Sequence, residues 1–167
     1  NRNYLSFTAY DNTNWGAGTY VGWTWKANSG TTSSNTDGSI TSTVQANQDA
    51  GFSIVTYTGT GSTGTYGHGL SSSPDLIITK RRDAVEGWLV WSSSLSASNY
   101  MYLNSTGAAG TDTNAYKTIS STTNQIGTDV TVNTSGGSYI SYCFHSVAGY
   151  SKMGTYTGNG STNGPII

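Results

Sequence analysis

Short stretches in which apolar and polar residues alternate are the feature that most limits the folds this sequence can adopt. In residues 19–27, Val21, Trp23 and Trp25 occupy every second position, with polar or small residues between them. Successive side chains of a β-strand point to opposite faces, so this period of two predicts a strand with one buried side. We expect further strands at residues 5–9, 39–44, 52–58, 75–81, 87–91, 100–103, 129–132 and 139–145. No stretch has the 3.6-residue period of an amphipathic helix.

Turn-forming segments separate these predicted strands. Residues 59–62 and 135–137 are examples, rich in Gly, Ser and Thr. The apolar run Leu76-Ile77-Ile78 predicts a central strand that is covered on both faces. Ser, Thr, Asn and Gly together make up just over half of the chain. Many short strands between such turns predict an all-β fold, an antiparallel β-sandwich or jelly-roll-like module.

The charge content is low and argues against several classes of partner. Charged residues make up 9% of the 167 residues, and the net charge is -1. This balance does not favour a nucleic-acid partner, and no apolar stretch approaches the roughly 20 residues of a membrane helix. We therefore expect neither nucleic-acid binding nor membrane insertion. The single Cys143 cannot form an internal disulfide, so packing and subunit association must stabilise the fold.

Two segments occur twice in the chain. Residues 18–27 align with residues 137–146, and residues 50–59 align with residues 148–158, which have one extra residue. The first residue, Asn1, and the apolar last residues fit a piece of a longer chain. The repeats predict four segments: residues 1–27 as the end of a preceding β module or strands completing the sandwich, 28–49 as a Ser/Thr/Gly-rich loop or linker, 50–146 as the main β-sandwich module, and 147–167 as the start of a repeated module or a C-terminal strand.

Several motifs follow one another along the chain, together with the segment from Trp88 to Trp91. They are GFSIVTYTG at residues 51–59, GHGL at 67–70, PDLIITKRR at 74–82, SYISYCF at 138–144 and AGYSKMGTYTG at 148–158. In this order they resemble a repeated β module of uncharacterised bacteriophage virion and tail-fibre-like proteins. The resemblance implies a structural role and a location in the virion or outside the cell, and it brings no catalytic residues with it.

From the residues and this resemblance we expect a non-enzymatic virion structural protein. It would be a tail fibre, appendage or capsid-surface component that mediates subunit assembly and attachment to the host surface. The expected partners are further copies of the chain in a homo-oligomer, a trimer or a larger array, other virion proteins and a host cell-surface glycan. One alternative is a monomeric carbohydrate-binding, lectin-like module of a secreted bacterial protein. Another is a polysaccharide depolymerase that would use Asp83 and Glu86.

Five residues near the middle of the chain are candidates for a ligand site or an interface. Three of the seven Lys and Arg residues are consecutive, namely Lys80, Arg81 and Arg82. They would bind an anionic polymer, form a subunit interface or keep a strand edge charged against unwanted pairing. Trp88 and Trp91 fall on opposite faces of one predicted strand. We expect one of them in the core and the other facing a partner, a ligand or a neighbouring sheet.

The two histidines and the oxygen-rich loops were considered as further sites. His68 lies between two glycines, which predicts an accessible imidazole in a turn, bonded to a nearby carbonyl or available to a ligand or interface. His145 aligns with Lys26, which predicts a solvated or interface position. Two His and one Cys are too few for a typical zinc site, and residues 11–14 and 112–114 leave a calcium site open. We expect no catalytic residue, cofactor or bound metal.

Overall fold

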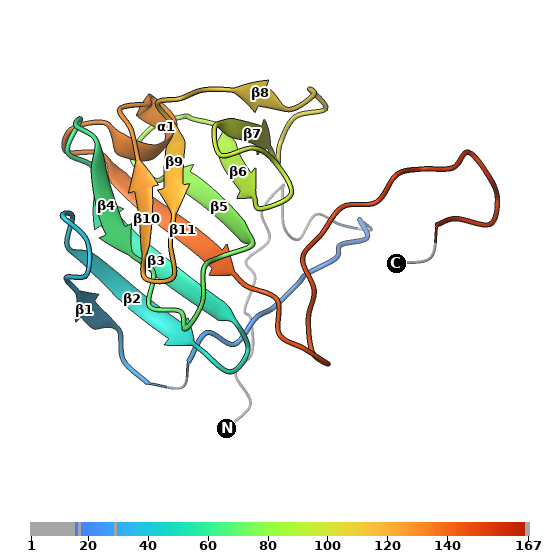
Figure 1. Ribbon diagram of the computed structural model, residues 1–167, viewed down its shortest axis with the longest axis horizontal. Coiled ribbons are helices and arrows are strands. Elements are labelled where there is room, and N and C mark those ends of the chain that lie inside the picture. The colour runs from blue at the N-terminus through green and yellow to red at the C-terminus, as the bar shows by residue number, and fades with distance from the viewer. Residues whose placement is uncertain (1–15, 17, 29, 166–167) are drawn as a thin grey trace.

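The fold is an antiparallel β-sandwich, as the computed structural model shows for residues 16, 18–28 and 30–165 (Figure 1). An eight-stranded sheet has the order β1-β2-β3-β11-β5-β6-β7-β8, and a three-stranded sheet has the order β4-β10-β9. The elements are β1 (Ser33–Asn35), β2 (Ser42–Asn47), β3 (Phe52–Thr58), β4 (Gly64–Gly67), β5 (Leu76–Arg81), β6 (Trp88–Ser92), β7 (Asn99–Tyr102), β8 (Gly110–Thr111), β9 (Tyr116–Ile119), β10 (Thr123–Ile126), α1 (Val130–Asn133) and β11 (Ser138–Phe144). The predicted all-β sandwich is confirmed. Among the described residues, no helix is long and apolar enough to cross a bilayer.

The centre of the large sheet is built from four of the predicted strands, β3, β11, β5 and β6. β11 pairs with β3 along its whole length, with Phe144 opposite Phe52 and Ser138 opposite Thr58. On its other side β11 pairs with β5, which in turn pairs with β6. β5 is therefore a central strand, as predicted. Only its inner face is fully covered, because Leu76 and Ile78 on the outer face are half-buried.

The core between the two sheets contains three stacked tyrosines. The ring of Tyr57 lies 4.4 Å from that of Tyr66 and 5.3 Å from that of Tyr139, nearly parallel to both. Their hydroxyls donate to the Val132 carbonyl, the Ser141 hydroxyl and the Val130 carbonyl respectively. A buried tyrosine needs such a partner for its polar end, so these bonds let a chain rich in Tyr use its rings as core.

Residues 19–27 do not form the predicted strand. They run in an extended conformation without ladder hydrogen bonds, and Val21 and Trp23 are 72% and 73% exposed. Alternation reports which side chains share a face, but a strand also needs a neighbouring backbone to pair with. We call residues 18–27 the arm.

Residues 28–49 are more than the loop or linker that their composition predicts. They contain β1 and β2, and β2 pairs with β3 from Ser42 opposite Tyr57 to Asn47 opposite Phe52. The inner side chain Val44 joins the core. Thr and Ser suit a strand that has one polar face, so pairing with β3 decides the structure of this segment.

Residues 129–132 are helical rather than a strand. Asp129 caps α1, and its side chain accepts a hydrogen bond of 2.8 Å from the Thr131 amide. This N-cap outweighs the β-propensity of Val130 and Val132. The strands β4, β9 and β10 were not predicted, and the strand expected at residues 5–9 lies outside the described residues.

Candidate interaction site on the outer face of the large sheet

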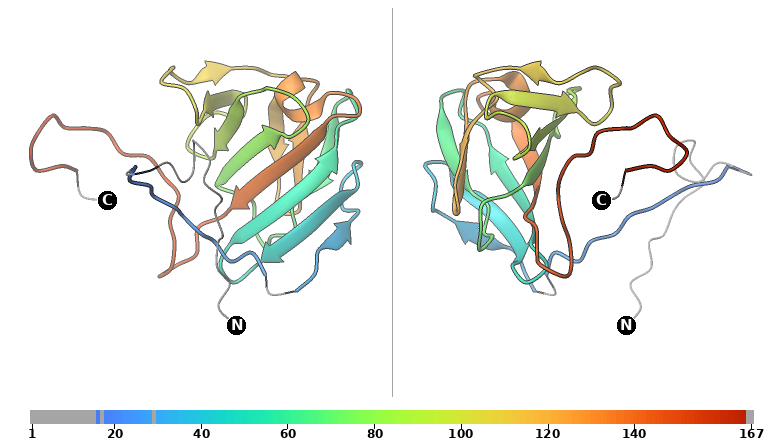
Figure 2. Two further views of the ribbon diagram at one scale, coloured as in Figure 1. Left: turned by 180° about the vertical axis from the view of Figure 1, so that it is seen from behind. Right: turned by 45° about the vertical axis from the view of Figure 1, so that its right-hand side comes forward.

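The outer face of the large sheet is apolar. It is the face turned away from β4, β10 and β9, and among the described residues no β-layer covers it (Figure 2). Alternate residues of the four central strands form it, and the apolar ones are Phe52, Ile54, Leu76, Ile78, Trp88, Val90, Ile140, Tyr142 and Phe144. Polar residues, Thr56, Lys80, Ser92 and Ser138, lie at its margins. Most of these side chains are half-buried. A continuous apolar sheet face of this kind is typical of a contact surface.

The arm is anchored at one end of this outer face. Ala27 is buried there against Phe52 and Phe144. The ring of Trp25 lies 5.7 Å from Phe144 in an edge-on contact and 6.2 Å from Phe52. The rest of the arm leaves the sandwich on this side, as the right-hand view of Figure 2 shows. The arm is thus attached at its root and exposes its two other aromatic side chains, Tyr20 and Trp23.

A groove of about 510 Å³ lies between the arm and the sheet. Its lining consists of Trp23, Thr24, Trp25, Phe52, Ile54, Ile78, Trp88, Leu103, Tyr142 and Phe144. All but Thr24 are apolar or aromatic. Such a groove can accept apolar or aromatic side chains of a protein partner, or the apolar face of a sugar ring.

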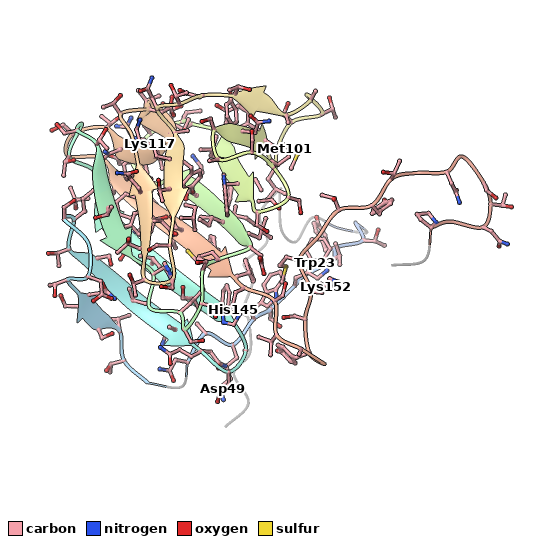
Figure 3. All side chains as sticks on the ribbon, in the orientation of Figure 1. Trp23, Asp49, Met101, Lys117, His145 and Lys152 are labelled. Atoms are coloured by element: carbon pink, nitrogen blue, oxygen red, sulfur yellow. The ribbon has the colours of Figure 1, made fainter. Side chains whose placement is uncertain are left out.

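The C-terminal residues 147–165, which we call the tail, leave the sandwich on the same side. A tight turn starts the tail, in which the Ser151 amide donates to the Val147 carbonyl at 2.9 Å. Met153 packs against the cluster around Phe52, whereas Tyr150 and Tyr156 are largely exposed. Figure 3 labels Trp23 on the arm and Lys152 on the tail, both outside the sandwich.

The two candidate tryptophans divide between the two faces as predicted. Trp88 lines the outer groove, whereas Trp91 is buried in the core, with its ring 6.4 Å from that of Tyr116. Of the two, only Trp88 can therefore reach a partner of the folded protein.

The three basic candidates do not form one patch. Lys80 lies opposite Trp88 in the register of β5 and β6, and its ammonium donates to the Glu86 carbonyl at 2.9 Å. Arg81 pairs with Asp83 at 2.9 Å, and Arg82 lines a separate polar hollow. The prediction that these residues keep a strand edge charged is wrong, because β5 is not an edge strand and lies between β11 and β6.

Asp83 and Glu86, the carboxylates considered for a depolymerase, both face Arg81. The Arg81 guanidinium lies 2.9 Å from Asp83 and 4.0 Å from Glu86. The hydrogen bond from Arg81 lowers the pKa of Asp83, whereas a general acid needs a raised one. The geometry is that of an ion-paired hairpin and gives no support to a catalytic pair.

His68 lies fully buried in the core, so the prediction of an accessible imidazole is wrong. Its Nε2 contacts the Ser120 carbonyl at 3.3 Å, which confirms the turn residue bonded to a carbonyl, and Nδ1 accepts from the Leu70 amide at 3.2 Å. Burial lowers its pKa. His68 therefore serves the fold as a neutral hydrogen-bonding side chain.

His145 is also buried, 8% exposed, where a solvated or interface position was predicted. Its Nε2 lies 3.5 Å from the Ser71 hydroxyl, and Asp75 accepts from the neighbouring Ser146 amide at 2.7 Å. The other ring nitrogen, Nδ1, contacts the Ser146 carbonyl at 2.9 Å. Ser71, His145 and Asp75 are the residue types of a catalytic triad, in which the carboxylate accepts a hydrogen bond from the imidazole. Here Nδ1 of His145 contacts the Ser146 carbonyl and Asp75 accepts from the Ser146 amide, so the geometry of a triad is not formed.

The described residues contain no cluster of three or more His, Cys, Asp or Glu that could hold a metal. Asp112 accepts from the Asn114 amide at 2.7 Å, which shapes the loop, while residues 11–14 lie outside the described residues. The buried Cys143 packs in the core, and burial raises its thiol pKa to about 12.

A second hollow, of about 530 Å³, lies beside β1 and β2 and is polar. Its lining includes Lys26, Asn28, Asn35, Asn47, Gln48 and Asp49, the last of which is labelled in Figure 3. The sequence did not predict it because all of these residues except Lys26 belong to the segment that was predicted to be a linker. Part of its hydrogen-bonding capacity is already used, since the Asn47 amide donates to the Lys26 carbonyl at 3.2 Å.

Fold and site together define an antiparallel β-sandwich with an open apolar face flanked by an arm and a tail. The chain belongs to the family described as a domain of unknown function, DUF7483, which matches residues 3–167. No curated protein and no solved structure matches the chain.

Proposed function

We propose that this chain is a virion structural protein, a component of a tail fibre, an appendage or the capsid surface. Its outer sheet face, together with the arm, binds other subunits. The observation that carries this proposal is the apolar groove between arm and sheet, which Trp23, Trp88 and Leu103 line. The resemblance of the motifs to phage virion modules supports the setting.

The outer face offers several apolar side chains to such a contact. Full burial of one large apolar side chain contributes about 1.5–3 kcal/mol, and association costs about 4–15 kcal/mol in lost freedom. Several side chains must therefore be covered together, and the central strands provide them side by side. A virion holds many copies, so even a weak single contact gains strength through multivalency.

A charge placed in the groove tests the proposal. Leu103 is 62% exposed and lines the groove, so Leu103→Asp should leave the fold intact. We expect the native mass, followed by light scattering at micromolar concentration, to show association of the wild type and at least about 10-fold weaker association of the variant. Thr118→Asp, on the exposed side of β9, is the matched control and should associate like the wild type. Equal association of both variants would contradict the proposed role of the outer face.

A carbohydrate-binding role is a second candidate, supported by the polar hollow. Amide, carboxylate and ammonium groups from Asn35, Asp49 and Lys26 can hydrogen-bond sugar hydroxyls. In this role the chain would attach to a host-surface glycan, either within a virion or as a lectin-like monomer. Binding of a glycan array that is lost in Asp49→Ala would support it, and binding that is unaffected by Asp49→Ala would contradict it.

A further inference from the structure

The two repeated segments carry the sequences of two strands that pair with each other. The arm repeats residues 137–146, which contain β11, and residues 148–158 of the tail repeat residues 50–59, which contain β3. β3 and β11 are hydrogen-bonded neighbours at the centre of the large sheet. The arm and the tail therefore have the sequences of two strands that can pair with each other.

The backbone supports the match between tail and β3. Gly51 before β3 and Gly149 in the tail both have a positive φ, of 64° and 74°. After the strand, Gly61 and Gly160 again match, with φ of 73° and 67°, within the shared pattern Gly-x-Gly-Ser-Thr. Positive φ is a conformation that few residues other than glycine adopt readily, so the tail reproduces both bends that flank β3.

Arm and tail begin at the same corner of the sandwich. In the sandwich, Phe144 lies opposite Phe52. Their counterparts, Trp25 and Tyr150, line one hollow of about 320 Å³. The arm runs toward this corner and the tail runs away from it, which is the antiparallel direction that the β3 and β11 pair has (Figures 1 and 2). Beyond the corner they separate, and residues 18–26 and 152–158 form no strand.

We propose that the arm of one copy pairs with the tail of a second copy as β11 pairs with β3. The one extra residue of the tail, within residues 152–154, would form a bulge, which sets Val21 opposite Thr155. This rests on the proposed function and names the partner. Tyr20 and Tyr156 would then lie opposite each other, as Tyr139 and Tyr57 do in the core. An isolated two-stranded ribbon is only marginally stable in water. Reciprocal exchange between two copies brings four such strands together, and this favours a second copy over the tail of the same chain.

Cysteine cross-linking between differently tagged copies tests this register. A chain with Val21→Cys is mixed with a chain that carries Thr155→Cys, and both are oxidised mildly. The native Cys143 is buried with a raised pKa, so it does not compete. We expect an interchain disulfide at least about 10-fold more abundant than with Tyr150→Cys as the second variant. Tyr150 lies five residues before Thr155 in the tail. With one of these residues in a bulge, it is still four strand positions, about 13 Å, from Thr155, which exceeds the reach of a disulfide.

Each outcome decides the inference. Equal cross-linking to both tail positions would overturn it. A double variant that carries Val21→Cys and Thr155→Cys and closes its disulfide only within one chain would also overturn it. If the wild type associates in a manner sensitive to Leu103→Asp, but no linkage from Val21→Cys to Thr155→Cys forms, this inference fails and the proposed function stands. A protein that stays monomeric at micromolar concentration contradicts both.

Discussion

Phe52 and Phe144 face one another across the β3 and β11 pair with ring centroids 4.7 Å apart, and Trp25 of the arm packs edge-on against Phe144. Together with Ala27 the two phenylalanines form a small cluster on the outer face, separate from the tyrosine core between the sheets. This cluster attaches the arm to the sandwich and holds one wall of the groove.

Trp25→Ala should release the arm without unfolding the sandwich. An aromatic pair contributes about 0.5–1.5 kcal/mol, so the free energy of unfolding should fall by about 1 kcal/mol or less. Trypsin cleavage after Lys26 should become several-fold faster in limited proteolysis. Trp23→Ala is the control, because Trp23 is 73% exposed and should change neither quantity. Equal cleavage of both variants would contradict the anchoring role of Trp25.

Tyr66→Phe should destabilise the fold through one lost hydrogen bond. The Tyr66 hydroxyl donates to Ser141 at 3.1 Å in a fully buried position, and Ser141 also contacts the Thr79 hydroxyl at 2.6 Å. A net loss of about 1 kcal/mol in the free energy of unfolding is expected, measured by chemical denaturation. Tyr156→Phe in the exposed tail should leave this free energy unchanged. If Tyr66→Phe is as stable as the wild type, the Tyr66 hydroxyl contributes nothing to the free energy of unfolding.

Gly51→Ala should cost more stability than Gly136→Ala. Both glycines have a positive φ, so alanine pays the same backbone strain at each position, about 1–2 kcal/mol. A Cβ at Gly51 would also lie 2.5 Å from the His145 carbonyl oxygen, whereas one at Gly136 would meet nothing within 4 Å. Urea denaturation of both variants should show the difference in the free energy of unfolding. Equal decreases would mean that the backbone around His145 moves to accommodate the added Cβ at no cost.

Lowering the pH should destabilise the fold through His68. Burial lowers the folded-state pKa of this imidazole below the unfolded value of about 6.5. The unfolded state then binds more protons, so stability is complete above about pH 6.5 and falls as the pH drops toward the folded pKa, by at most about 1.4 kcal/mol per pH unit.

The His68→Gln variant should show a smaller pH dependence than the wild type. Its amide can still donate to the Ser120 carbonyl, but it does not titrate in this range. Denaturation at a series of pH values between about pH 7 and about pH 5 gives the two slopes. Identical slopes would contradict a neutral, buried His68.

The sequence predicted the central strands well because their alternation reports burial. The expected range 52–58 coincides with β3, and those near β5, β6 and β11 are displaced by about one residue at either end. The strands β4, β9 and β10 escaped prediction because each has only four residues and one or two large apolar side chains, so pairing rather than side-chain pattern makes them strands.

The candidate site could be predicted only in part. The split between Trp88 and Trp91 follows from strand periodicity, but the groove also needs Leu103 and the arm, which tertiary structure brings to the same face. The arm has the clearest alternation in the chain, yet it has no ladder partner among the described residues. His68 was misplaced because flanking glycines predict a turn but not its depth.

Hydroxyl-radical footprinting at high and at low protein concentration can show whether the outer face is the contact surface between copies. We predict that Trp88 and Leu103 are protected at high protein concentration, while Val130, exposed on α1, is labelled equally at both concentrations. Labelling of Trp88 and Leu103 that does not change with concentration, or equal protection of Val130, would contradict the account.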